Sequence, residues 1–359
     1  MHGEYKKILI AEAGGIGDMV MSTPVLNVLR KRFPRSIITL LTVPRSAKAL
    51  TSKHYVDKII CFNQESFSKS LSSAAYDQIL SNLKLLWTLR KERFDMMIDL
   101  EAIETWKASL LRYIFFKSIG ARNKVGRNSN GRGFFLDVKV HENILETTHE
   151  IDRKLLIAKA LGAETNNPKQ NFLVSSEDRG SIDSWLQDSN VANDQVIVAM
   201  HPGSFAPIKR WKREGFIEIG KRLYERYNAQ IILTGDSNDK VVYEMKKELI
   251  NAKPMVAVGF PLGRLGALLE RTHLFISNDT GPCHIADAIN TPLVVIFGPD
   301  DHHRYGPYNT KSKSRIVTGM KISCSPCLKY ECKTHECMES ITSDMVWEEV
   351  ESLMKEINK

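Results

Sequence analysis

Short apolar runs alternate with amphipathic stretches along most of the chain. In the first half, the apolar runs predict strands near Ile8–Ala11, Ile37–Val43, Lys58–Phe62 and Met96–Leu100. Stretches with apolar residues at helical spacing predict helices near Thr23–Arg32 and Tyr76–Arg93. Strands that alternate with helices are typical of parallel sheets with crossover helices.

The second half repeats this pattern. Strands are predicted near Val196–Met200, Gln230–Leu233, Met255–Val258, Leu274–Ser277 and Leu293–Phe297. Helices are predicted near Arg213–Tyr227, Lys240–Ile250, Leu262–Glu270, Gly281–Ile289 and Ser343–Ile357. Between the halves, a Ser- and Asp-rich stretch from Gly162 to Ser189 suits a linker. We therefore expect an α/β protein of two Rossmann-like domains, at 1–175 and 190–340, facing each other across a cleft, with a C-terminal helix at 341–359.

The composition fits this division. The chain has 359 residues, of which 43% are hydrophobic, so it is globular and long enough for two domains with separate cores. An apolar run near the N-terminus stops at Glu12, which is too short for a signal peptide. No stretch is long and apolar enough for a transmembrane helix. We expect the protein to stay in the cytoplasm.

The charge is positive and unevenly spread. The formal net charge is +8, which favours an anionic partner. No acidic residue lies between Glu104 and Asp137, and the basic residues in that window are Lys107, Arg112, Lys117, Arg122, Lys124, Arg127 and Arg132. Apolar residues between Leu110 and Phe116 accompany them, so this segment could seat a helix on an anionic membrane or bind a phosphorylated glycolipid; the alternative is a buried helix with solvated basic ends. No nucleic-acid partner is expected, because no helix-turn-helix, zinc-finger or RNP pattern accompanies the charge.

The most informative motif is Ser277-Asn278-Asp279-Thr280-Gly281-Pro282-Cys283-His284, which leads through a short helical stretch into the apolar run Leu293–Phe297. The order predicts a strand, an acidic turn, a short helix and another strand. Free backbone N–H groups at the start of a helix bind phosphate. The motif therefore indicates a nucleotide-linked substrate.

Further motifs follow one another along the chain. Near the N-terminus they are Gly14-Gly15-Ile16-Gly17-Asp18 and Ser22-Thr23-Pro24-Val25-Leu26. In the second half they are His201-Pro202-Gly203-Ser204, Lys209-Arg210-Trp211, Leu233-Thr234-Gly235-Asp236, the acidic turn, Phe297-Gly298-Pro299 and Gly306-Pro307-Tyr308. As an ordered set, they resemble glycosyltransferase family 9, the lipopolysaccharide heptosyltransferases and their relatives, over roughly residues 6 to 355. The resemblance implies a GT-B architecture with an N-terminal acceptor-binding domain, a C-terminal nucleotide-sugar donor-binding domain and a closing helix that packs back toward the first domain.

Asp18 is the candidate catalytic base. Sugar transfer from a nucleotide donor needs a base that takes the proton from the acceptor hydroxyl, and the resemblance implies this role for Asp18. The alternative is that Asp18 caps a helix that starts near Met19. The glycines before it match neither the dinucleotide-binding fingerprint nor a P-loop.

The resemblance places donor binding in the second half. A departing diphosphate builds up negative charge, which cations and N–H groups stabilise. Lys209 resembles the family's donor-phosphate lysine, with Ser204 in the preceding turn, while Thr280 and Gly281 offer a hydroxyl and N–H groups. The alternative for Lys209 is a solvated surface lysine.

Four more side chains are candidates for contact with the donor. Asp279 could accept hydrogen bonds from the transferred sugar, as the resemblance implies, or cap the helix that follows it. His284 could touch the donor or be a core histidine. Asp236 and Asp239 are both placed for a ribose, because carboxylates suit vicinal hydroxyls.

A separate signal lies near the C-terminus, where four of the six cysteines fall within 14 residues: Cys324, Cys327, Cys332 and Cys337. In a cytosolic protein this density indicates a thiolate metal site rather than disulfides, with zinc or iron as the metal. The spacing differs from that of a standard zinc ribbon, and reduced, metal-free thiols are the alternative. Either way the role is structural, because the resemblance implies a sugar transfer that needs no cofactor.

Taken together, these residues predict an inverting glycosyltransferase that moves heptose from ADP-heptose to the inner core of lipopolysaccharide. Its acceptor is then a lipid A-core glycolipid, and the protein is cytoplasmic or peripheral on the inner membrane. The alternatives are a same-fold enzyme with another sugar nucleotide or a protein acceptor, and a non-enzymatic sugar-nucleotide-binding protein.

Overall fold

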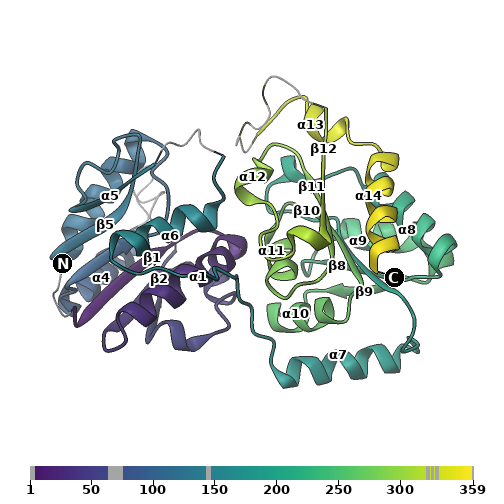
Figure 1. The fold of residues 1–359 in the computed structure, drawn as a ribbon, viewed down its shortest axis with the longest axis horizontal. Helices are drawn as coiled ribbons and strands as arrows, with labels where there is room; N and C mark the ends of the chain where they lie inside the picture. The colour runs from purple at the N-terminus through teal and green to yellow at the C-terminus, as the bar shows by residue number, and fades with distance from the viewer. Residues whose placement is uncertain are drawn as a thin grey trace. The chain divides into compact units, whose positions relative to one another are not determined.

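The computed structural model describes residues 5–63, 76–142, 147–320, 324, 327 and 331–357. The chain divides into two compact units, Met1–Lys169 and Gln170–Lys359. Each unit is one six-stranded sheet covered by helices (Figure 1). The expected α/β class with two Rossmann-like units is thus confirmed.

The first unit is built on a sheet with the strand order β3-β2-β1-β4-β5-β6, in which all neighbouring strands are parallel. Its strands are β1 (Lys7–Glu12), β2 (Ile37–Thr42), β3 (Lys58–Cys61), β4 (Met96–Asp99), β5 (Asn123–Ser129) and β6 (Val138–Glu142). Its helices are α1 (Ile16–Arg32), α2 (Pro44–Ala47), α4 (Tyr76–Glu92), α5 (Trp106–Ile119) and α6 (Glu150–Ala160), with a 3-10 turn at Lys53–Tyr55. In the register, Leu9 of β1 lies opposite Thr39 of β2 and Met97 of β4. The loops after β1 and β4 therefore leave the sheet at the same edge.

Strands β5 and β6 were not predicted, because they are polar. Arg127 of β5 is fully buried, and its guanidinium pairs with Glu142 of β6 and Glu150 of α6. A buried charge needs such partners, since desolvation of an unpaired ion is costly. Ion pairs therefore extend this sheet where the apolar pattern gives no signal.

Helix α1 begins at Ile16, well before the predicted start at Thr23, and it runs through Pro24. Proline has no N–H for the carbonyl of Val20, four residues earlier. The hydroxyl of Thr23 donates to that carbonyl instead, at 2.7 Å. The Thr-Pro pair is therefore compatible with a continuous helix.

The second unit has the strand order β12-β11-β10-β7-β8-β9, again all parallel. Its strands are β7 (Ile197–His201), β8 (Gln230–Gly235), β9 (Met255–Val258), β10 (Leu274–Asn278), β11 (Leu293–Phe297) and β12 (Ser314–Thr318). Its α-helices are α7 (Ser176–Asp188), α8 (Arg213–Tyr227), α9 (Lys240–Glu248), α10 (Leu262–Glu270), α11 (Gly281–Ala288), α12 (His302–Tyr305), α13 (Glu336–Glu339) and α14 (Ser343–Ile357). Short 3-10 turns lie at Pro207–Lys209, Ile250–Ala252 and Lys311–Lys313. The predicted strands of this half are present, and the edge strand β12 was missed.

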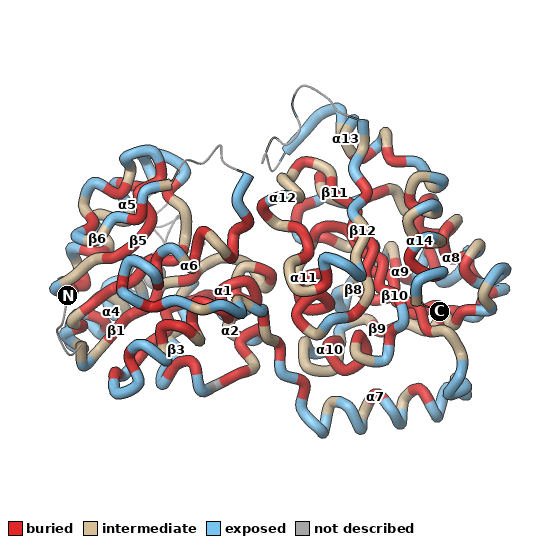
Figure 2. Tube along the Cα trace, in the orientation of Figure 1, coloured by how far each residue is buried: buried red, intermediate tan, exposed pale blue. Residues whose placement is uncertain are grey.

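Buried residues follow the central strands of each sheet (Figure 2). The predicted closing helix is α14, which packs against β11, β12 and α8 of its own unit. Its buried side chains include Val346, Val350 and Leu353, which belong to the core of the second unit. The placement of this helix relative to the first unit stays a prediction.

The stretch predicted as a linker contains helix α7. Ser175 caps this helix by accepting a hydrogen bond from the N–H of Asp178 at 3.0 Å, and Ile182 and Leu186 are its buried residues. The helix packs on α10, so part of the predicted linker belongs to the second unit. Among the helices in the described ranges, none is both long and apolar enough to cross a membrane.

Candidate active site

Asp18 lies on the first turn of α1, directly after the loop that follows β1. Its Oδ2 accepts a hydrogen bond from the N–H of Gly15 at 2.7 Å. The N-cap residue of the helix is Gly15, so Asp18 is not the N-cap of a helix that starts near Met19; its side chain still helps to cap α1, because it accepts from the N–H of the N-cap residue as the third residue of the helix. At Gly14 a Cβ would come within 2.5 Å of the Cβ of Asp18, which explains why glycine occupies this position.

A buried polar cluster of Glu12, Ser22 and Lys154 contacts this loop. The ammonium of Lys154, on α6, donates to Glu12 Oε2 at 2.5 Å and to Ser22 Oγ at 2.7 Å. Ser22 also donates to the same carboxylate oxygen, and Glu12 Oε1 accepts from the N–H of Gly14 at 3.2 Å. Burial lowers the pKa of Lys154, but the carboxylates of Glu12 and Asp18 offset that effect and the pKa is raised overall. Lys154 therefore remains charged and joins both ends of the loop that carries Asp18.

A second group of charges lies beside the loop, at the end of β4. Arg112 pairs with Asp99 at 2.6 Å and with Glu101 at 2.8 Å. Glu101 Oε1 accepts from the N–H of Ala13 at 2.7 Å. Burial raises the pKa of Glu101 to about 7, helped by the nearby carboxylates, while Arg112 opposes the rise. The acidic edge around Asp18 thus contains a carboxyl group that titrates near neutral pH.

In the second unit, Lys209 meets two carboxylates at the ends of β10 and β11. Its Nζ lies 2.9 Å from Asp279 Oδ2 and is also in contact with Asp300 Oδ2. Burial lowers the pKa of Lys209, but the two carboxylates more than offset this and raise it overall. Lys209 is thus a charged side chain held in an ion-pair cluster, and the alternative of a solvated surface lysine is wrong.

Asp300 was not singled out from the sequence. Burial raises its pKa to about 6, and the neighbouring Asp279 adds to the rise, whereas Lys209 lowers it. Two carboxylates that share one ammonium cannot both ionise as easily as isolated groups. The available signal was its position directly after the Phe297-Gly298-Pro299 motif, because β11 neighbours β10 and both strands end at the same edge.

Thr280 and Gly281 form the start of α11. Thr280 is the N-cap residue in an extended conformation, and its hydroxyl makes no capping hydrogen bond. Asp279 is buried, and its backbone N–H donates to the carbonyl of Ile296 at 3.1 Å. The alternative that Asp279 caps the helix is therefore wrong. The hydroxyl of Thr280 and the positive end of the α11 dipole are available for an anion beside Lys209.

His284 is buried on α11, and its Nε2 lies 3.9 Å from Asp279 Oδ1. With Cys283, these residues form the group in the described part of the chain whose possible metal-ligand atoms all lie within 4.8 Å of one another. Burial raises the pKa of the Cys283 thiol, which favours its neutral form, and the ammonium of Lys209 already binds Asp279. The chemistry of this group therefore does not favour a metal ion.

Ser204 is buried in the loop after β7, and two neighbours fix that loop. Its carbonyl accepts from Arg210 Nε at 2.9 Å and from Arg210 Nη2 at 2.7 Å. Asn278 Nδ2 donates to the carbonyl of Pro202, and Asn278 Oδ1 accepts from the N–H of Trp211. The end of β10 thus orders the segment that carries both Ser204 and Lys209.

The two aspartates considered for a ribose differ in their surroundings. Asp239 is the N-cap residue of α9 and accepts from the N–H of Val241 at 3.2 Å, while Asp236 is exposed. A Cβ at Gly203 would lie 3.1 Å from Asp239 and 3.2 Å from the ring of His201. Asp239 is therefore the one that the fold brings to the Ser204 loop.

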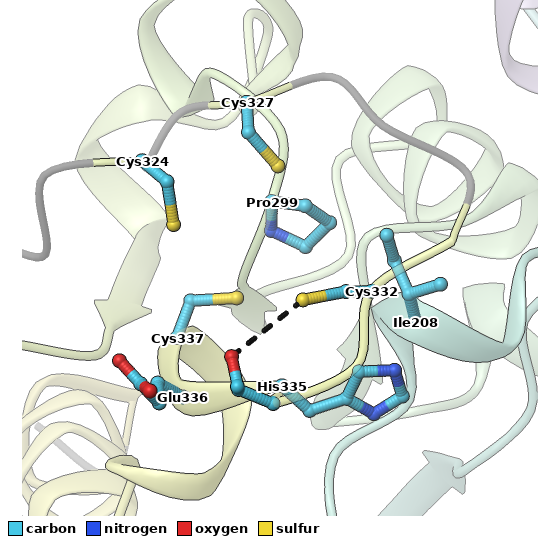
Figure 3. Close-up of a pocket in the computed structure, with 9 residues that line it drawn as sticks. Ile208, Pro299, Cys324, Cys327, Cys332, His335, Glu336 and Cys337 are labelled. Carbon is cyan, nitrogen blue, oxygen red and sulfur yellow. Dashed lines mark hydrogen bonds between the residues drawn. The ribbon is translucent and has the colours of Figure 1, made fainter.

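The four C-terminal cysteines line one pocket with Pro299, His335 and Glu336 (Figure 3). All four are free thiols, and the sulfur atoms project toward the space between them. They do not meet the close ligand spacing of the Asp279 group, so a bound metal requires the sulfurs to draw together. Four soft thiol ligands on one pocket nevertheless suit zinc or iron.

Comparison with known proteins identifies the family. The sequence profile of glycosyltransferase family 9 (heptosyltransferase) matches residues 82–338, more than half of the chain. The chain belongs to glycosyltransferase family 9. It is 25% identical to the lipopolysaccharide heptosyltransferase 3 of Escherichia coli K12 over 305 residues, which cover 81% of this chain and 82% of that protein.

Solved structures share the fold of this family 9 glycosyltransferase. A family 9 glycosyltransferase from Veillonella parvula superposes with a TM-score of 0.76 at 21% identity, covering 99% of both chains. The E. coli heptosyltransferase WaaC, solved with ADP-2-deoxy-2-fluoro heptose, gives a TM-score of 0.69 at 18% identity and covers 96% of this chain and 99% of WaaC. The expected GT-B fold class is confirmed, and the expectation of an enzyme is confirmed at the level of the family.

In the family 9 enzyme, the predicted residues fall into two groups. Asp18 belongs to the first unit, and a charged environment that the sequence did not reveal surrounds it. Ser204 follows β7, and Asp279, Thr280, Gly281 and His284 follow β10. Lys209 lies on the 3-10 turn Pro207–Lys209 and reaches the end of β10 through its ion pair with Asp279. Ligands of open α/β sheets bind beyond these strand ends.

Proposed function

We propose that this family 9 glycosyltransferase transfers heptose from ADP-heptose to the inner core of lipopolysaccharide, with inversion at the anomeric carbon. The names of its relatives support the sugar and the acceptor class, and the heptose-nucleotide analogue in the WaaC structure supports the donor. The observation that carries the proposal is the charged Lys209, held between Asp279 and Asp300 beside the start of α11.

In the proposed reaction, the donor diphosphate binds Lys209 and the start of α11. Bond cleavage at the anomeric carbon leaves a second negative charge on the β-phosphate of the departing ADP, which the Lys209 ammonium and the Thr280 hydroxyl stabilise. Asp279, freed from Lys209 in part, accepts hydrogen bonds from the sugar hydroxyls. His284 packs behind Asp279, and the Arg210-anchored loop brings Ser204 to the phosphates.

Asp18 takes the proton from the attacking acceptor hydroxyl. Its carboxylate is held by the N–H of Gly15, and the Glu12, Ser22 and Lys154 cluster keeps its loop in one position. The acceptor is a lipid A-core glycolipid at the inner membrane. The chemistry we propose uses side chains and backbone groups only, with no catalytic cofactor.

The test is a transfer assay with purified protein, ADP-heptose and a lipopolysaccharide that lacks its heptoses. Mass spectrometry of the lipid is expected to show the addition of heptose. The reaction mixture is expected to contain released ADP. Transfer from a different sugar nucleotide only, or transfer to a protein hydroxyl only, would replace the substrate while keeping the family. An Asp18→Asn variant controls for contaminating activity.

We also propose that Cys324, Cys327, Cys332 and Cys337 hold a structural zinc or iron. The support is the set of four soft ligands on one pocket. Cys337 belongs to α13, and the N–H of Cys327, which follows β12, donates to the carbonyl of Pro299 on the loop after β11 at 2.8 Å. The metal would tie these segments together. Metal analysis of protein purified without chelators tests this proposal. About one bound ion per chain is expected in the wild type, and the Cys332→Ser variant is expected to lose it. A metal-free wild-type protein whose melting temperature does not change when metal is added would contradict the proposal.

A further inference from the structure

Helices α4 and α5 pack next to each other on the sheet of the first unit. Their inner sides contribute Leu89, Phe116 and Ile119 to the core, where they meet Leu9 and Met97 of the strands. The inner sides of both helices are thus buried in the core of the first unit. The outer sides determine what this surface of the unit can bind.

The outer sides carry large apolar side chains at helical spacing. We call them the apolar face; its residues are Leu80, Leu83, Trp87, Trp106, Leu110 and Ile114. Each of the six is between 48% and 62% exposed. Single exposed apolar residues are ordinary on a protein surface, but a set of six on two adjacent helices indicates a binding surface.

The charges around the apolar face are almost all positive. Exposed cations on the same two helices are Lys84, Arg90, Lys91, Lys107 and Lys117. Helix α5 contains no acidic residue, although the exposed Glu104 precedes it. The acidic residues of α4 are Asp77, at its start, and Glu92, which is paired with Lys7 at 2.7 Å. Lys91 lies 3.3 Å above the ring of Trp87, which places a cation directly beside an exposed tryptophan.

We propose that the apolar face docks the protein on an anionic lipid bilayer. Exposed tryptophan and leucine flanked by lysine and arginine is the composition of helices that lie in the membrane interface, where apolar side chains enter the acyl boundary and cations meet lipid phosphates. Tryptophan in particular favours this boundary. The excess of positive charge complements an anionic bilayer, whereas a second copy of this chain would bring the same cations together.

The docking surface is connected to the loop of Asp18 through Arg112. This residue projects from α5 and pairs with Asp99 and Glu101, and Glu101 in turn accepts from the N–H of Ala13. A helix held at the lipid surface is thereby linked by direct contacts to the loop that precedes the candidate base. The inference does not rest on the proposed reaction, because vesicle binding is measured without donor or acceptor.

The test is co-sedimentation of the full chain with vesicles of phosphatidylcholine alone or mixed with phosphatidylglycerol. We expect binding to the anionic vesicles only, weakened by added salt. The double variant Trp87→Ser and Trp106→Ser should bind at least about tenfold more weakly, since two large apolar anchors are lost. The matched control is Ile250→Ser, which removes an apolar side chain that is 64% exposed on the second unit and should bind as the wild type does.

A second readout uses the unmodified protein. Brominated acyl chains in the anionic vesicles should quench part of the tryptophan fluorescence, while Trp211, which is buried, provides an unquenched background. Absence of anionic vesicle binding, absence of quenching, or equal loss of binding in Ile250→Ser would overturn the proposal. A change in sedimentation coefficient in the double variant, with unchanged vesicle binding, would instead assign the face to contact between copies.

Discussion

Replacement of Lys209 by methionine tests the role of its charge. In the structure one ammonium serves two carboxylates, so the Lys209→Met variant leaves Asp279 and Asp300 facing each other without a cation. Loss of one preorganised charge that stabilises a leaving group costs roughly 10²–10³ in kcat. Loss of a partner for buried charges costs about 1–3 kcal/mol of unfolding free energy.

The two effects can be separated with a second substitution. In Lys209→Met with Asp300→Asn, the repulsion between carboxylates is removed, so most of the lost stability should return while kcat stays low. The matched control is Lys212→Met, three residues along, whose side chain belongs to no ion pair among those found in the described residues. Turnover is measured as ADP release and stability by urea unfolding. Recovery of activity in the double variant would refute the reasoning, because it would mean that Lys209 only neutralises the two aspartates.

Three further predictions concern the first unit. Asp18→Asn should leave donor binding unchanged in calorimetry but lower transfer by roughly 10²–10⁴-fold, as loss of a general base does; weaker donor binding would argue against that role. Lys154→Met should cost about 3–5 kcal/mol in urea unfolding, because it strands the buried Glu12, whereas the exposed Lys159→Met on the same helix should cost little. Glu101 has a pKa raised to about 7, so its contribution to stability is complete below its unfolded pKa near 4.5 and is lost as the pH rises through 7. The melting temperature of Glu101→Gln should therefore depend less on pH between pH 5 and about 8 than that of the wild type. An unchanged pH dependence would contradict the assignment.

The sequence predicted the central strands of both sheets, because those strands are apolar runs buried on both faces. It failed at the polar edges. β5 and β6 are held by the ion pairs of Arg127 with Glu142 and Glu150. From the sequence alone, a charged side chain that is buried in an ion pair cannot be distinguished from one that is exposed to water. The predicted helix began at Thr23, whereas α1 begins at Ile16 and includes Pro24, where the Thr23 hydroxyl bonds the carbonyl of Val20.

The site was predicted where motifs are contiguous in sequence and missed where contacts are long-range. Asp279, Thr280 and Gly281 could be named because they form one turn. Asp300 and Glu101 depend on which strands are neighbours, and Lys154 reaches Glu12 from a helix far along the chain. Such partners become visible only when the strand order is known.

The proposed reaction depends on the binding of ADP-heptose to the second unit through Lys209. The most direct measurement is the melting temperature of the purified protein with ADP-heptose, UDP-sugars, GDP-sugars and NAD, since a ligand that binds only the folded state raises it. We expect a rise in melting temperature with ADP-heptose alone, and a much smaller rise in Lys209→Met than in Lys212→Met. A rise with another nucleotide, or no rise with any, would contradict the proposed reaction.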